Sequence, residues 1–291
     1  MLTVAGEWNL GRRRLGDHLR DLRKRSGRSA EEAAQAIEHS LSTVSRIETG
    51  KNPIRRRDLL TLLDLYGIVD EGERAEVVKL YQDAQREPWW NEFDTVLDPG
   101  MGTYADLEDA ASDIRLYENI FVPGMAQLPT YTREILSAAQ PGAPTDEIDL
   151  RVRFRQDRQT QLLARQDRKL RLRVVVEESA LRRPVGGPVT MCRQIEHLHE
   201  FADHPGVTLQ IMPTARGAHA ALRGGFTILT SGAPARSTVY IDCGAGNLYL
   251  EKPAEVAQFA ELYDGLQAEA AGPQETHALL DRLAREIGQE Q

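Results

Sequence analysis

The sequence has few cysteines and no long apolar run. Two cysteines, Cys192 and Cys243, occur in 291 residues. They are too few for a disulfide framework, so we expect buried free thiols. No apolar stretch approaches the roughly 18 residues of a membrane span, and the opening MLTVAGEWNLGRRRLG has no apolar core of signal-peptide length. These absences exclude a disulfide-rich secreted protein and a membrane protein, and they predict a cytoplasmic one.

Motifs for cofactor and metal chemistry are also missing. The pairs Gly186–Gly187 and Gly224–Gly225 are interpreted as turns, because neither has phosphate-loop spacing. His197 and His199 would point about 200° apart on a helix, so together with His204 they do not predict a metal site. No Ser/His/Asp set is visible from the spacing. We expect no cofactor and no metal.

The net charge of −8 is unevenly distributed along the chain. Residues 1–57 carry 13 Lys and Arg against 7 Asp and Glu, a net of +6, whereas residues 58–291 carry 23 against 37, a net of −14. A basic first domain on an acidic remainder is typical of a DNA-binding head with a separate control domain. The chain is long enough for two domains with cores of their own.

The clearest local pattern runs from Gly27 to Tyr66, GRSAEEAAQAIEHSLSTVSRIETGKNPIRRRDLLTLLDLY. Ser29 and Ser40 each precede a short helical run, where a serine hydroxyl can accept the first free helix amides. The second run, Leu41 to Glu48, ends shortly before Gly50, which suits a left-handed helix end. Two short helices with a tight connection predict a helix-turn-helix whose second helix enters the DNA major groove.

Apolar spacing predicts which side of the second helix is free. Val44 and Ile47 form its buried face, and the outward positions are Ser42, Thr43, Ser45 and Arg46. Leucines at helical spacing predict covering helices before and after, at Leu15, Leu19 and Leu22 and at Leu59, Leu62 and Leu63. The alternative is a small helical bundle whose surface binds nothing.

The segments VSRIETGK, from Val44, and LLTLLDLYG, from Leu59, resemble the phage-repressor-like (XRE) helix-turn-helix of actinobacterial regulators. The resemblance implies that DNA is a partner and that residues at the start of the second helix lie at it: Ser40, Ser42, Thr43 and Arg46. The basic residues Lys51 and Arg55 are further candidate contacts.

Three positions depart from the family pattern. Ala30 stands where a glutamine often contacts a phosphate, Glu38 where the turn often has glycine, and Thr43 where a basic residue is common. Arginine clusters at 12–14, 23–28 and 55–57 surround the motif. Each cluster is either a phosphate contact or a solvated surface.

A tryptophan pair marks the predicted junction between domains. We expect a helix-turn-helix domain at 12–85, a linker at 86–103 and an α+β domain at 104–291. Within the linker, Trp89 and Trp90 lie beside Phe93. Paired aromatic residues in a linker predict docking of one domain on the other; a ligand pocket or an oligomer contact is the alternative.

The second domain is predicted to be α+β, with a sheet of about five strands. β-branched runs and alternation favour strands at 172–176, 207–212, 226–230, 239–242 and 248–250. Helical spacing favours helices at 104–119, 131–139, 146–173, 188–202, 253–270 and 273–287. The long charged helix at 146–173 is interpreted as a solvated face, with a second nucleic-acid surface as the alternative.

Several ordered segments of this domain resemble the domain of unknown function 5753 that accompanies such helix-turn-helix heads. They are FVPGM from Phe121, residues 127–131, Arg155-Gln156, ESALRR from Glu178, residues 217–219 and GFTIL from Gly225. The resemblance implies a transcriptional regulator whose C-terminal domain senses a small molecule or a small protein partner, often in an antitoxin-like arrangement.

The strand ends at Val176, Met212 and Leu229 are expected to gather in one region, because binding residues collect where loops converge. Polar residues close to these ends are the candidate ligand site, to which the tryptophan pair could contribute: Glu178, His219, Tyr240, Trp89 and Trp90. A structural pairing of Glu177, Glu178 or Asp242 with Arg182 or Arg183 is the alternative.

Two functions follow from these patterns. The first is a DNA-binding transcriptional regulator acting as a homodimer. The second is a regulator-like protein recruited as a cofactor-independent, pericyclase-type cyclase for a hydrophobic metabolite in a natural-product pathway, using shape and a few polar groups.

Overall fold

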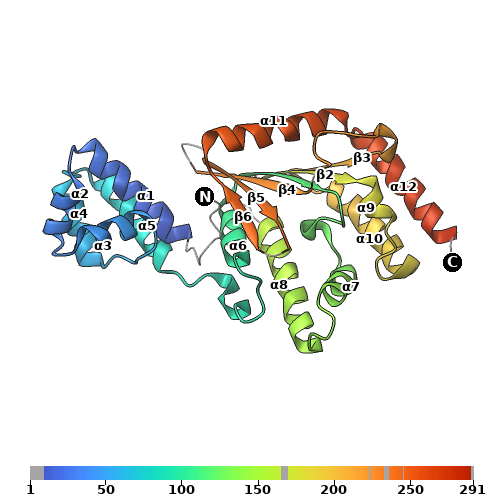
Figure 1. Ribbon diagram of the computed structural model, residues 1–291, viewed down its shortest axis with the longest axis horizontal. Coiled ribbons are helices and arrows are strands. Elements are labelled where there is room, and N and C mark those ends of the chain that lie inside the picture. The colour runs from blue at the N-terminus through green and yellow to red at the C-terminus, as the bar shows by residue number, and fades with distance from the viewer. Residues whose placement is uncertain (1–9, 165–169, 223, 233–235, 245, 290–291) are drawn as a thin grey trace. The chain divides into compact units, whose positions relative to one another are not determined.

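The computed structural model describes residues 10–164, 170–222, 224–232, 236–244 and 246–289. The chain forms two compact units that meet in the sequence between Asn91 and Glu92. We call them the head and the C-terminal unit and describe each by itself (Figure 1).

The described part of the head contains five helices: α1 (Leu10–Arg25), α2 (Ala30–Ala36), α3 (Leu41–Glu48), α4 (Arg56–Leu65) and α5 (Glu71–Gln85). Ser29 caps α2 reciprocally, because its hydroxyl accepts the Glu32 amide while the Glu32 carboxylate accepts the Ser29 amide. Ser40 caps α3 by accepting the Thr43 amide at 3.2 Å. Both predicted caps are confirmed.

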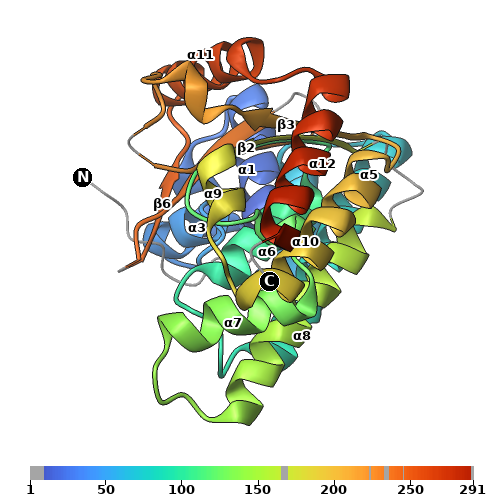
Figure 2. The same cartoon turned by 90° about the vertical axis from the view of Figure 1, so that its right-hand side faces the viewer.

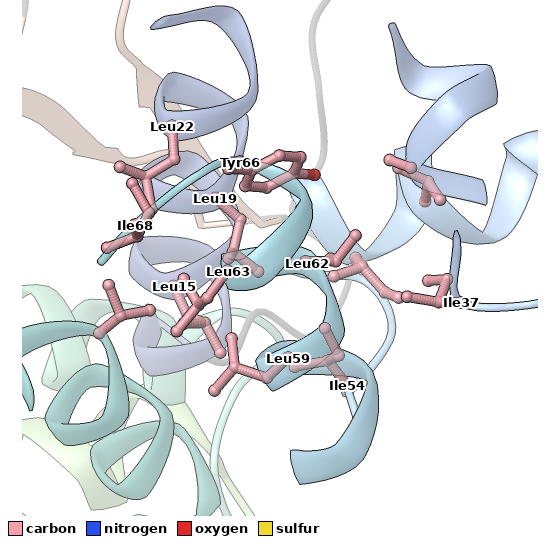
Figure 3. Close-up of a cluster of buried hydrophobic side chains, with 14 of the residues drawn as sticks. Leu15, Leu19, Leu22, Ile37, Ile54, Leu59, Leu62, Leu63, Tyr66 and Ile68 are labelled. Atoms are coloured by element: carbon pink, nitrogen blue, oxygen red, sulfur yellow. The ribbon is translucent and has the colours of Figure 1, made fainter. Parts of the chain in front are cut away.

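Leucines of α1 and α4 form the centre of the head's core (Figure 3). The side chains of Leu19, Leu59 and Leu63 are fully removed from solvent, and each such leucine stabilises the fold by about 1.5–3 kcal/mol. Val44 and Ile47 join this core from α3, as the apolar spacing predicts. The buried face of α3 is therefore fixed, and its other face points away from the core.

The turn between α2 and α3 forms without glycine. Glu38 has a φ of 57°, a left-handed conformation that costs a residue with a side chain about 1–2 kcal/mol. The His39 amide donates to Ala34 and the Glu38 amide to Gln35, which is the pairing of a Schellman helix end. The chain therefore keeps the turn geometry at the position where the family often has glycine.

Helix α1 approaches the end of α3 more closely than a side chain would permit. A methyl group on Gly16 would lie 2.3 Å from the carbonyl oxygen of Ile47 and 2.9 Å from that of Glu48. Gly50 has a φ of 72°, and a side chain there would meet the Arg13 backbone at 2.6 Å. Two glycines thus set the contact between α1 and the end of α3.

The C-terminal unit is built on a six-stranded mixed sheet in its described residues, with the order β3-β2-β1-β4-β5-β6. Its strands are β1 (Asp113–Glu118), β2 (Arg171–Glu177), β3 (Val207–Met212), β4 (Phe226–Ser231), β5 (Arg236–Asp242) and β6 (Asn247–Leu250). Strands β1, β2 and β3 are parallel. Strands β4, β5 and β6 continue the sheet in antiparallel fashion from β1.

Helices cover both faces of this sheet. Helix α11 (Pro253–Glu269) lies over one face, and α6 (Met101–Ala110), α8 (Thr145–Leu163), α9 (Glu178–Arg182) and α10 (Gly187–Ala202) lie on the other, as Figure 1 and Figure 2 show. Helix α12 (Pro273–Gln289) packs on α10 and β3. The remaining helical segments are α7 (Pro129–Ala139) and the short η1 (Trp89–Phe93), η2 (Gly124–Ala126) and η3 (Thr214–Arg216).

The sheet corrects two expectations about helices. The predicted helix at 104–119 ends at Ala110, and β1 follows from Asp113. The predicted helix at 146–173 ends as α8 at Leu163, while β2 already begins at Arg171. In both cases a central strand with buried faces takes over residues that polar helix spacing also fits. The α+β class is confirmed, with one strand more than the five or so expected.

The strand ends named above do not all meet at one edge. Glu177 at the end of β2 pairs with Met212 at the end of β3. Because β4 runs antiparallel to β1, Leu229 pairs with Ile114 near the start of β1, whereas Phe226 pairs with Tyr117. The expectation that Leu229 joins Val176 and Met212 is therefore wrong, and the start of β4 takes its place.

We predict that Gly16→Ala destabilises the head by about 1–3 kcal/mol, because the added methyl forces α1 away from α3. Thermal unfolding followed by circular dichroism measures the change. Gly265→Ala in α11 is the control, since nothing lies within 4 Å of the added methyl. An unchanged midpoint for Gly16→Ala would show that the two helices have room to separate.

Candidate DNA interface and ligand site

Three hydroxyl groups gather at the N-terminus of α3. The Ser40 oxygen lies 2.8 Å from that of Ser42 and 2.9 Å from that of Thr43. Ser40 and Ser42 are exposed and Thr43 is half-buried. Hydroxyl groups at the start of a recognition helix can contact either phosphates or base edges. The sequence prediction places these three residues together, and the structure does so too.

Basic side chains extend the exposed face beyond the helix. Arg46 is the single Lys or Arg in α3 and is exposed, as are Lys51 and Arg55 in the connection to α4. Arg57, two residues after Arg55, instead donates to Asp58 at 3.0 Å. These positions form a cationic border around a face that is otherwise neutral.

Arg23 serves the fold, a role that neither interpretation of its cluster includes. Its Nε and Nη2 donate to the two carboxylate oxygens of Glu48 at 2.6 and 2.9 Å. Both side chains are largely buried, and a further bond reaches the carbonyl of Arg28 at 3.1 Å. The pair joins α1 to the end of α3. Hydrogen bonding to Glu48 raises the pKa of Arg23.

Buried Asp58 links the helix-turn-helix connection to α4. Its carboxylate oxygens lie 3.4 Å from His39 Nε2 and 3.0 Å from Arg57 Nε. His39 is part of the turn between α2 and α3. The Asp58 carboxylate therefore connects the turn to the start of α4. The apolar spacing alone did not indicate this connection.

The tryptophan pair lies at the end of the head's sequence. Trp89 and Trp90 are half-buried in η1, whereas Phe93 is fully buried. The Phe93 ring packs against Phe154 of α8 with centroids 5.5 Å apart. Phe93 is thus an anchor of the C-terminal unit. The docking role of the two tryptophans stays a prediction.

Glu178 is held in a structural network. Its Oε1 accepts from Arg182 at 2.7 Å and from Arg282 at 3.3 Å, and its Oε2 accepts the Thr214 amide at 3.0 Å. Arg182 also donates to Glu286 of α12. The predicted structural pairing with Arg182 is present. It ties α9 to α12, so the Glu178 carboxylate has little capacity left for a ligand.

His219 lies against Glu177 rather than Glu178. Its Nε2 is 2.8 Å from Glu177 Oε1, the oxygen to which Tyr117 donates at 2.9 Å. Its Nδ1 accepts the Ala221 amide at 3.3 Å, whereas Nε2 is close to the carboxylate without the geometry of a hydrogen bond. The His219 side chain is almost wholly buried. The three side chains form a closed polar group at the carboxyl end of β2.

Tyr240 belongs to a third set of contacts. Its hydroxyl donates to Asn247 at 2.9 Å, and its ring packs between those of Tyr104 and Tyr249. Beneath Tyr104, Arg158 of α8 forms two bonds with Glu108 at 2.8 and 2.9 Å. Glu178, His219 and Tyr240 therefore each have their own partners. No contact among the described residues joins two of the three.

Helix α8 differs from the predicted solvated face. Arg158 is buried and Arg151 is largely covered, and they pair with Glu108 and Asp98 respectively. These two arginines of α8 therefore form ion pairs within the unit, because a buried charge without a partner is costly. The cysteines correct another expectation: Cys192 is half-buried and Cys243 is exposed.

A polar group that the sequence did not single out lies at the end of β1. The Glu118 carboxylate accepts the amides of Asn119 and Ile120 at 3.0 and 3.2 Å. Burial, and then the negative charge of Asp242, raise the pKa of Glu118 to about 7, although Arg155 acts in the opposite direction. An acid at the end of a strand is a weak sequence signal; its burial comes from the tertiary packing.

The two units match known families. A family described as "Domain of unknown function (DUF5753)" matches residues 101–282, and one described as "Helix-turn-helix domain" matches residues 14–77. The chain belongs to the DUF5753 family and carries a helix-turn-helix domain before it. No curated protein and no solved structure matches the chain.

The helix-turn-helix domain supports a DNA-binding regulator, and DNA as its partner. No described helix combines the length and apolar character needed to cross a membrane. Within the described ranges, no three His, Cys, Asp or Glu side chains gather closely enough to hold a metal ion.

We predict that Arg23→Ala destabilises the head by roughly 3 kcal/mol, because it leaves Glu48 largely buried without its cation. Arg25→Ala is the matched control, since that side chain is 66% exposed in its pair with Glu73 and should change stability by less than about 1 kcal/mol. Urea unfolding, with hydrogen exchange to assign the transition to the head, measures both. Equal losses would contradict a special role for the Arg23–Glu48 pair.

We predict that Glu118 makes the C-terminal unit less stable as the pH rises from about 4.5 to about 7. The unfolded carboxyl ionises near 4.5, whereas the folded one keeps its proton up to about 7. The stabilisation is complete below the unfolded pKa and declines until the folded pKa is passed. Glu118→Gln should match the parent at pH 4 and be more stable by up to roughly 3 kcal/mol at pH 8.

Denaturation midpoints across this pH range test the Glu118 prediction. Glu261→Gln, at an exposed position of α11, removes one carboxyl elsewhere and serves as the control. Parallel pH profiles for the parent and Glu118→Gln would show that Glu118 titrates at its ordinary value.

Proposed function

We propose that this protein is a DNA-binding transcriptional regulator whose C-terminal unit senses a small molecule or a small protein partner. The observation that supports it most is the recognition helix: α3 is held from behind by a core and by the Arg23–Glu48 pair. Its hydroxyl-rich N-terminus and Arg46 remain exposed in the head. Such a helix can enter a major groove without rearranging the head.

Ser40, Ser42 and Thr43 would contact phosphates and base edges at the start of the helix, and Arg46 would supply the bidentate base contact. Lys51 and Arg55 would hold the DNA backbone on either side. Because these contacts release counterions, affinity should fall steeply with salt. We propose a homodimer, in which two heads would meet half-sites spaced about 34 Å apart.

The sensing role rests on the C-terminal unit, in which buried charges and aromatic rings lie at the sheet edge beyond the ends of β1, β2 and β5. An effector bound there would change DNA affinity by about 1–3 kcal/mol if it favours one state of the protein. Turnover of a metabolite by a protein without specific DNA binding would instead support the cyclase.

We predict that Arg46→Ala weakens DNA binding by about 1–3 kcal/mol, because the bidentate base contact is lost. A gel-shift titration at fixed salt, on DNA selected by the parent protein from a random library, measures the affinity. Lys79→Ala on α5 removes one exposed positive charge elsewhere in the head and should leave affinity nearly unchanged. The same affinity for Arg46→Ala and the parent would count against α3 as the recognition helix.

A further inference from the structure

Arg155 differs from the other arginines of α8. Arg151, Arg153 and Arg158 each have a carboxylate within 3.4 Å, from Asp98, Glu92 and Glu108 respectively. In the described part of the chain, the guanidinium of Arg155 has one hydrogen bond, to Gln127 Oε1 at 2.7 Å, and no ion pair. A guanidinium has five N–H donors, so most of the donors of Arg155 remain unused.

The surroundings of Arg155 make this unusual. Burial, and then the positive charge of Arg158, lower the pKa of Arg155 to about 10. A charge removed from water normally pairs with an opposite charge, because desolvation costs several kcal/mol. Asp242 and Asp98 act on Arg155 only through space, without an ion-pair contact. Arg155 is half-buried, and within the described ranges no carboxylate forms an ion pair with it.

Unused hydrogen-bonding groups lie around the same point. Glu118 at the end of β1 interacts electrostatically with Arg155 and Asp242, and its Oε1 alone holds the two backbone amides. Asn119 Oδ1 is buried without a hydrogen-bond partner among the described residues. On α7, Tyr131 interacts electrostatically with both Glu118 and Arg155, and its hydroxyl accepts the Val122 amide. The cluster therefore offers a cation, a protonatable acid and a free acceptor.

We propose that Arg155, Glu118 and Asn119 form the binding site of an organic acid, whose anionic group pairs with the Arg155 guanidinium. This inference rests on the sensing role proposed above and names the class of ligand. Protonated Glu118 donates to the bound acid through Oε2, and Asn119 Oδ1 accepts from a hydroxyl or amino group beside it. A ligand with an acid and an adjacent donor satisfies all three groups.

The lack of an ion-pair partner for Arg155 in the described residues has a simple energetic interpretation. Binding sites often keep charges that destabilise the free protein and that the ligand compensates. If Arg155 were a structural clamp, its removal would weaken the unit. If Arg155 is instead a ligand-binding residue, Arg155→Met should raise the melting temperature of the ligand-free protein, because it removes an unpaired charge. Gln127 Oε1 would still accept its hydrogen bond from Thr132 at 3.0 Å.

The experiment compares full-length parent, Arg155→Met and Arg155→Gln by thermal shift, with benzoate, L-phenylalanine and inorganic phosphate as probes. Benzamide is the neutral match for benzoate. An acid probe should raise the parent's melting temperature by a few degrees at saturation, and benzamide should not. Both Arg155 variants should lose this response, whereas Arg153→Gln, an exposed and paired arginine on the same helix, should keep it.

A pH series adds a readout that a structural role would not change. Because the proton of Glu118 takes part in binding, the acid response should be larger at pH 6 than at pH 8, and Glu118→Gln should remove this difference. The proposal is overturned if no acid probe stabilises the parent, if Arg155 variants respond like the parent, or if both ligand-free variants are destabilised as strongly as Arg158→Met.

Gel shifts on the selected DNA separate this inference from the proposed function. DNA binding without any acid response would overturn the acid site and leave the regulator in place. An acid response that depends on Arg155, in a protein without specific DNA binding, would overturn the regulator and leave the site. A response to benzoate or L-phenylalanine supports the site, whereas a response to phosphate alone would overturn an organic acid as its ligand.

Discussion

The pairing of β1 with a parallel strand on one side and an antiparallel strand on the other governs the arrangement of the C-terminal unit. Parallel pairing places the ends of β1, β2 and β3 at one edge of the sheet. The reversal at β4 places the end of β5 at that same edge, since Thr227 near the start of β4 pairs with Tyr240. Polar residues distant in the sequence are thereby collected at one place, where loops rather than strands surround them.

Charge placement shows which of these residues serve the fold. Most of the buried ions have partners with good geometry: Glu108 with Arg158, Glu178 with Arg182, and Glu48 with Arg23 in the head. Each pair joins two elements, because in the low dielectric of the interior a fixed partner offsets the loss of water. Glu118 and Arg155 lack such partners, and this contrast separates them from the structural set.

The head was more predictable than the C-terminal unit, because its signals are local. Ser29 and Ser40 act within one helical turn, and the leucines of α1 and α4 follow simple helical spacing. β1 was missed because Leu107, Ala110 and Ile114 fit one helix face, while the backbone turns extended at Ala111. Only pairing with β2 and β4, which is remote in sequence, makes Asp113–Glu118 a strand.

The candidate site shows the same division. Glu178, His219 and Tyr240 lie near strand ends as expected, yet Glu178 and His219 are occupied by Arg182 and Glu177, which sequence proximity could not reveal. The sequence placed Arg155 on the long charged helix and in the Arg155-Gln156 segment of the family resemblance, without a role of its own. Arg155 differs from its neighbours because no carboxylate pairs with it in the described residues. Only the tertiary structure shows this, since it brings the neighbouring side chains together.

An unpaired charge in the C-terminal unit gives regulation a physical starting point. A ligand shifts a two-state protein only through a difference in its affinity for the two states. An acid that neutralises Arg155 can supply such a difference, because any movement of α8 relative to the end of β1 alters the spacing of Arg155 and Glu118, which lie on those two elements. Linkage then requires that DNA binding change the affinity for the acid by the same factor. The energy needed is modest, since a tenfold effect corresponds to about 1.4 kcal/mol.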